Sequence, residues 1–114
     1  MRARSSLRPA RDRLVDHLLA GLRRHAHPDC RIRLVRERPW ASITFSGTRY
    51  SFELSLAGRP NKDIFGKNEQ ALADHDFDLD GHFVADLLVT PASPTPRQHC
   101  QVEILVIVDP VDQR

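Results

Sequence analysis

The segment 76–81, with the sequence DFDLDG, is where residue types and spacing come closest to a chemical motif. It begins like the calcium loop of an EF-hand, in which oxygen ligands recur at alternate positions, a glycine stands at position 6 and a bidentate glutamate closes the site at position 12. Position 12 is Leu87 here, whose side chain has no oxygen for a cation. The pattern therefore predicts no EF-hand. It leaves weak binding of a divalent cation as the metal hypothesis, with the candidate ligands Asp76, Asp78, Asp80 and His82.

The same stretch alternates in a way that is typical of a β-strand. From residue 76 to residue 89 the apolar residues are mostly odd-numbered and the acids are all even-numbered. Successive side chains of a strand point to opposite faces of the sheet. We therefore predict a strand over residues 82–89, preceded by a loop in which the aspartates are exposed. The side chains expected to face the core are Phe83, Ala85, Leu87 and Val89.

Two further groupings of polar residues are candidate sites. Asp78, Asp80 and His82 would form a metal-dependent hydrolytic site if Glu53 lay on a neighbouring strand. Histidines and cysteines after the first predicted helix and at the start of the last predicted strand have the ligand types of a zinc site, but not the spacing of a familiar one. No glycine-rich phosphate loop and no G-x-S-x-G motif occurs. The sequence therefore predicts no cofactor, assigns no catalytic residue and leans away from an enzyme.

The charges of the chain are unevenly distributed. Residues 1–38 contain eleven arginines and four acids, a balance of +7, whereas residues 39–114 contain six cations and eleven acids, a balance of −5. Such asymmetry is found in proteins with an anionic partner, and equally where the arginines of a helix and an edge strand face acids of the same chain. Nucleic-acid binding is therefore an alternative function rather than the favoured one. Its candidate residues are Arg8, Arg11, Arg23, Arg24, Arg31, Arg33, Arg36 and Arg38.

Two helices are predicted from the hydrophobic periodicity. Leucines and a valine recur at three- and four-residue spacing over residues 6–26, which predicts an amphipathic helix that Pro28 ends. A second helix is predicted over residues 62–74, with Asn61 as its N-cap. The apolar side chains expected on this second helix are Ile64, Phe65, Ala71 and Leu72.

A β-hairpin is the clearest local prediction. Residues 40–56 read WASITFSGTRYSFELSL, in which apolar and polar residues alternate on both sides of Gly47. A two-residue turn at Gly47-Thr48 places Ile43 opposite Phe52 on the buried face, whereas a turn at Ser46-Gly47 keeps the same faces with another register, so the register stays open. The turn at Gly47-Thr48 also places Ala41 opposite Leu54.

Two other strands flank these elements. A strand over residues 30–37 comes before the hairpin and is expected to end at Pro39. A loop with three prolines occupies residues 91–98 and is followed by a strand over residues 100–108. That last strand contains ILVIV, a continuous apolar run that is typical of a strand buried on both faces and therefore central in its sheet.

These elements predict a single α+β domain over residues 1–114, with disordered ends at 1–5 and 110–114. The expected order is α-β-β-β-α-β-β. Two helices would pack on a mixed, mostly antiparallel sheet of about five strands.

Composition limits the class of protein. The chain is 40% hydrophobic and 28% charged, which is typical of a globular domain. No apolar run approaches the roughly 20 residues of a membrane span and no signal-peptide pattern is present, so we expect a cytoplasmic protein without a membrane partner. Fifteen arginines against two lysines favour a GC-rich, bacterial coding sequence. The function we expect is a binding module for a protein or a small ligand, with a homodimer formed through exposed strand edges.

Overall fold

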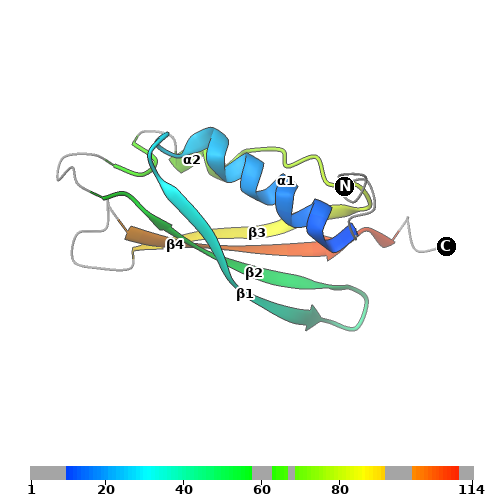
Figure 1. Ribbon diagram of the computed structural model, residues 1–114. Coiled ribbons are helices and arrows are strands. Elements are labelled where there is room, and N and C mark those ends of the chain that lie inside the picture. The colour runs from blue at the N-terminus through cyan, green and yellow to red at the C-terminus, as the bar shows by residue number, and fades with distance from the viewer. Residues whose placement is uncertain (1–9, 58–62, 67–68, 92–98, 111–114) are drawn as a thin grey trace, which may run out of the picture.

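A four-stranded antiparallel sheet with its helices on one face makes up the fold (Figure 1). The computed structural model describes residues 10–57, 63–66, 69–91 and 99–110. Its elements are α1 (Ala10–His25), β1 (Arg31–Ala41), β2 (Ser46–Ser55), α2 (Glu69–Ala73), β3 (His82–Pro91) and β4 (His99–Val108). The strand order is β1-β2-β4-β3, and every neighbouring pair is antiparallel. The α+β class is thus confirmed, with four antiparallel strands in place of about five in a mixed sheet.

The core lies between α1 and the inner face of the sheet. Leu18 and Leu22 of α1 are fully buried, because the leucines recur along one side of the helix. They meet alternate residues of the two central strands, which confirms the inward face predicted for β2 and the central place predicted for β4. The residues these strands contribute to the core are Tyr50, Phe52, Leu54, Cys100, Val102, Ile104 and Val106.

The predicted hairpin is wrong in its turn and in one of its strands. β1 continues through Pro39 as far as Ala41, so two of the predicted strands are one. The turn lies at residues 42–45, where the Ser42 amide donates to the Phe45 carbonyl. Ile43 is therefore fully exposed in the turn, and Phe52 pairs with Leu34 of β1 and Val102 of β4. Because β1 is an edge strand, a proline in it removes no obligatory sheet hydrogen bond.

The second helix is shorter than predicted. Of the described residues in the predicted range of 62–74, only Glu69–Ala73 is helical, and Asn61, Lys62, Lys67 and Asn68 lie outside the described residues. Ile64 and Phe65 are buried nonetheless, from a segment with no regular structure. Leu72 is fully buried while Ala71 is exposed. The apolar pattern thus predicted burial of three of the four side chains, but not the helix that was expected to carry them.

Strand β3 forms where it was predicted, but it faces the core differently. A register shift lies between Val84 and Asp86, which is the signature of a β-bulge. Leu87 contacts the core as expected, and Val89 does so too. Before the bulge the alternation is reversed, so Val84 contacts the core while Phe83 is exposed on the other face. Ala85 is also exposed, so two of the four predicted inward side chains are wrong.

Parts of the sequence prediction lie outside the described residues. These parts are the start of the first helix at residues 6–9, residues 92–98 of the loop predicted at 91–98, and the chain ends at 1–5 and 111–114. Pro91, the first residue of that predicted loop, is instead the last residue of β3. Among the helices that the structure does describe, none is both long and apolar enough to cross a membrane.

Candidate functional site

The DFDLDG segment is a loop attached to α1 by its apolar residues. Phe77 is buried and its ring occupies the space over Gly21, where a Cβ atom would collide with it. The three aspartates are exposed, as predicted. The Asp76 carboxylate accepts a hydrogen bond from the Asp78 amide at 3.1 Å, and Asp78 adopts a positive φ of 47°. This carboxylate therefore holds the shape of its own loop, which is a common use of aspartate in turns.

A pocket of about 500 Å³ joins this loop to α1, with Asp78, Asp80 and His82 facing His17. Each histidine donates from Nδ1 to a backbone carbonyl, over 2.7 Å for His17 and 2.8 Å for His82. Glu53 does not line this pocket, because it lies on β2 and bonds to Arg33 of β1. In the part of the chain that the structure describes, no three His, Cys, Asp or Glu side chains are grouped so as to hold a metal ion. The set expected for a hydrolase is therefore not brought together.

The cysteines belong to the core rather than to a zinc site. Cys30 and Cys100 are both buried and unpaired with each other, whereas His99 is exposed on the outer face of β4. Burial raises the pKa of Cys100 to about 12, with smaller contributions from Cys30 and from Glu69. Burial also raises the pKa of Cys30. Both side chains therefore stay protonated at neutral pH, which makes them poor nucleophiles and poor metal ligands.

Two histidines far apart in sequence meet at the end of α1. Nε2 of His25 and Nδ1 of His75 share a hydrogen bond of 3.0 Å, and the two rings lie edge to face. The His75 ring also packs edge to face on Phe77. Burial lowers the pKa of His25, and the charges of His75 and Arg24 lower it further. The fold therefore favours the neutral form of His25.

This pair predicts that the protein is less stable in acid. The unfolded chain takes up a proton on His25 near the ordinary pKa of about 6.5, while the folded chain does so only at lower pH. The free energy of unfolding should therefore fall as the pH drops through about 6.5, and His25 should contribute no pH dependence well above that value. Urea unfolding at pH 7.5 and at pH 5.0 measures the loss. In His25→Gln the decrease in the free energy of unfolding between the two pH values should be smaller than in the parent protein. In His99→Gln, an exposed control, the decrease should be unchanged. An equal decrease in His25→Gln and the parent protein would show that His25 does not cause it.

The outer face of the sheet, turned away from both helices, carries the remaining candidate residues. Cross-strand partners share a face, so the rows of this open face can be followed from β1 across β2 and β4 to β3. The rows are Trp40–Gly47–Ile107–Phe83, Arg38–Arg49–Leu105–Asp86, Arg36–Ser51–Glu103–Leu88 and Arg33–Glu53–Gln101–Thr90. The open face is thus basic along β1 and the adjoining part of β2, and mixed toward β3, where apolar residues alternate with Asp86, Thr90, Gln101 and Glu103.

A β-bulge at Val35 gathers the arginines on the open face. Without it, the strict alternation of a strand would turn Arg33 and Arg36 to opposite faces. The register shift between Leu34 and Arg36 adds one residue, and the side chains after the bulge then change face. Arg36 and Arg38 consequently lie on the same face as Arg31 and Arg33, and all four are exposed.

Three of the open-face arginines form one group, which we call the arginine group: Arg36, Arg38 and Arg49. Arg38 and Arg49 are direct cross-strand partners, a placement of like charges that destabilises a sheet. Arg49 approaches Glu103 at 3.9 Å. Within the described part of the chain no carboxylate pairs with Arg36 or Arg38. Two cations of the group are therefore available to an anion, at a position where an anion would relieve their repulsion.

An aromatic end adjoins the arginine group on the open face, and we define it as Trp40, Phe45 and Phe83. Phe45 and Phe83 lie edge to face with ring centroids 6.4 Å apart, and they are 39% and 40% exposed. Gly47 lies between Trp40 and Ile107 in the same cross-strand row and adds no side chain. Two large apolar rings are thus held in place and still offer about two fifths of their surface.

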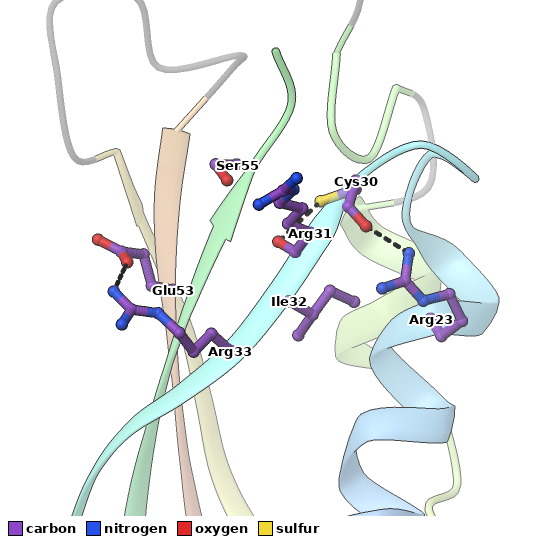
Figure 2. A pocket seen from close by; sticks show the side chains of 7 residues that line it. All are labelled: Arg23, Cys30, Arg31, Ile32, Arg33, Glu53 and Ser55. Carbon is purple, nitrogen blue, oxygen red and sulfur yellow. Dashed lines mark hydrogen bonds and ion pairs between the residues drawn. The ribbon is translucent and has the colours of Figure 1, made fainter.

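The start of β1 forms an open pocket of about 690 Å³ (Figure 2). Arg33 and Glu53 lie on the side of β1 that faces away from α1 and form an ion pair of 2.6 Å. Arg23 of α1 lies on the opposite side, where it donates to the Cys30 carbonyl at 2.6 Å. Arg31 completes the basic lining of the pocket. Arg23 therefore has a local structural partner, and the arginines expected to act together are divided between two sides of β1.

The sequence identified only part of this surface. Arg31, Arg33, Arg36 and Arg38 are gathered on one face, whereas Arg23 and Arg24 belong to α1. Arg8 and the side chain of Arg11 lie outside the described residues. Arg49 and the aromatic end were not anticipated, although Trp40, Phe45 and Arg49 all occur within the ten residues of 40–49.

No family model, no curated protein and no solved structure matches this chain.

Proposed function

We propose that this protein binds nucleic acid on the open face of its sheet, with the arginine group as its contact to phosphates. The observation that carries the proposal is the cross-strand pair Arg38 and Arg49 beside Arg36, a concentration of like charge on one face of the sheet. Such a group raises the energy of the folded protein when it is alone. A polyanion would lower that energy by neutralising the group and releasing its own counterions.

The arrangement of the arginines along β1 suits an extended polyanion. Arg31, Arg33, Arg36 and Arg38 follow one strand in sequence, and residues of a strand rise by about 3.3 Å each. The open face thus has a basic edge roughly 20 Å long from Arg31 to Arg38. Contacts spread along an edge suit a polymer of phosphates better than a small ligand, which needs a concave site.

The positions of the acids on the open face indicate where phosphates would bind. Glu53 pairs with Arg33, Glu103 lies near Arg49, and Asp86 lies on β3 at the far end of the row that contains Arg38 and Arg49. The net positive charge is therefore greatest at Arg36 and Arg38. If the three members of the arginine group each neutralise one phosphate, the logarithm of affinity for a single strand should fall with the logarithm of salt with a slope of about −2.

Fluorescence anisotropy with a labelled 20-nucleotide oligonucleotide tests the proposal. We expect micromolar binding near physiological salt and a loss of about 20-fold in affinity between 50 and 200 mM salt. The variant R36S/R38S/R49S should lose most of this affinity, and the salt slope should approach zero. R13S/R24S, which removes two arginines from α1, is the control and should change affinity less than about threefold.

Two results would refute the proposal. One is the absence of binding at 50 mM salt with protein at about 100 μM, a concentration that detects even nonspecific contacts. The other is an equal loss of affinity in R36S/R38S/R49S and R13S/R24S, which would show that net charge matters and the open face does not. Thermal unfolding of both variants ensures that the comparison is between folded proteins.

A further inference from the structure

We propose that the nucleic acid is a single strand, and that its unpaired bases stack on Phe83 and Phe45 while its phosphates contact the arginine group. This inference depends on the proposed function and specifies the class of ligand. It applies equally to single-stranded DNA and RNA, because both present base faces and phosphates.

The position of the aromatic end relative to the arginines is the first argument. Trp40 follows Arg38 by two residues in β1, so the two side chains lie on the same face about 7 Å apart along the strand. Phe83 and Asp86 occupy the β3 positions of the same two neighbouring rows. A nucleic-acid backbone whose phosphates contact Arg38 and Arg49 therefore has its bases within reach of the aromatic rings. These rings lie in the neighbouring row, which contains more apolar residues.

The exposure of the two phenylalanines is the second argument. Phe83 is 40% exposed and Phe45 is 39% exposed, although the neighbouring row residue Ile107 is only 2% exposed. The two rings meet edge to face, a geometry that favours one relative orientation of the pair. Base–aromatic stacking is the main sequence-tolerant contact in single-strand recognition, because every base has an apolar face.

The width of the sheet is the third argument and distinguishes single strands from duplexes. The major groove of B-DNA admits an α-helix or a two-stranded ribbon, whereas the open face is formed by four strands. Bases within a duplex already stack on each other and offer no face to a protein. The four-stranded sheet can therefore use its aromatic rings only with unpaired bases, and a duplex would contact the arginines alone.

The bulge in β3 is what places Phe83 on the open face, where a base could stack on it. The register shift between Val84 and Asp86 turns Phe83 to the open face, on the same side as Leu88. A regular strand would have directed Phe83 toward the helices if Leu87 and Val89 kept their places. The two bulges, at Val35 in β1 and in β3, thus supply the arginines and the aromatic ring of the same surface.

The test compares ligands that differ only in their bases. Oligonucleotides of 20 residues would be used as single-stranded DNA, single-stranded RNA, the DNA duplex, and an abasic strand with the same phosphates. We expect both single strands to bind about tenfold or more tightly than the duplex and the abasic strand. Phe83→Ala should weaken single-strand binding about 5- to 100-fold and leave duplex binding unchanged.

Matched variants separate stacking from general surface effects. Leu88→Ala removes an exposed apolar side chain from the same strand and face and should change affinity less than about twofold, because it offers no ring. Phe83→Tyr should retain binding. The comparison of the abasic strand with the normal strand uses the parent protein. It therefore tests base stacking even if Phe83→Ala folds poorly.

Each outcome distinguishes this inference from the proposed function. If single strand, duplex and abasic strand bind equally and only R36S/R38S/R49S weakens them, phosphate binding stands and base stacking is refuted. If nothing binds, both proposals fail. Sedimentation that shows a dimer dissociating on Phe83→Ala would also overturn the inference, because a second copy of the chain would then cover the rings.

Discussion

Replacing Phe52 by alanine should lower the free energy of unfolding by about 3–5 kcal/mol. Phe52 is fully buried in β2, with Leu34 and Val102 as its cross-strand neighbours beneath Leu18 and Leu22 of α1. Both neighbouring strands and the helix enclose the ring, so the cavity cannot close without separating them. Urea unfolding followed by circular dichroism measures the loss.

Phe83→Ala is the informative control, because it removes the same ring from the same sheet. Phe83 is 40% exposed and its main aromatic partner is Phe45, so the expected loss is no more than about 1.5 kcal/mol. A loss under about 1 kcal/mol for Phe52→Ala would mean that the centre of the sheet is not tightly packed. A loss as large for Phe83 as for Phe52 would mean that Phe83 serves the fold, which would weaken its assignment to a ligand.

Burial could be predicted from the sequence for residues that follow the repeat of a single strand or helix. Phe52 and its neighbours at alternate positions of β2 are buried as the alternation requires, and the apolar run Ile104–Ile107 is buried in β4, which is central between β2 and β3. Leu18 and Leu22 follow from helical periodicity. These predictions need only the repeat of one element and the rule that apolar side chains avoid water.

The open face was not predictable in the same way, because it depends on bulges. A bulge adds one residue to one strand and changes the face of every residue beyond it. Arg33 and Arg36 therefore share a face although their numbers differ in parity, and so do Phe83 and Leu88. Nothing local distinguishes Val35 as a bulge site. The choice follows from pairing with β2, where Leu34 and Arg36 face consecutive residues.

The predicted turn of the first hairpin was wrong for a related reason. Gly47 was expected to form the turn because glycine tolerates the backbone angles of tight turns. It instead lies inside β2, opposite Trp40. Its role is determined by the approach of another strand, which only the tertiary structure reveals.

Replacing Gly47 by alanine should lower the free energy of unfolding by about 2–3 kcal/mol. A Cβ atom on Gly47 would overlap the Val106 carbonyl oxygen and would lie 3.0 Å from the Ile107 Cα atom. Both are backbone atoms of β4, so no side-chain rotation can relieve the contact. β2 and β4 would have to separate at the end of the sheet that carries Phe45 and Phe83.

The Gly47→Ala variant should therefore lose single-strand affinity along with stability, while binding through the arginines remains. Urea unfolding and anisotropy with the single-stranded and duplex oligonucleotides measure the two effects. Ser46→Ala is the matched control, since it alters the adjoining exposed residue of β2 and should change stability by less than about 0.5 kcal/mol. If Gly47→Ala were as stable as Ser46→Ala, the close contact of β2 and β4 at this row would be wrong. In that case the aromatic end would not depend on Gly47 for its geometry.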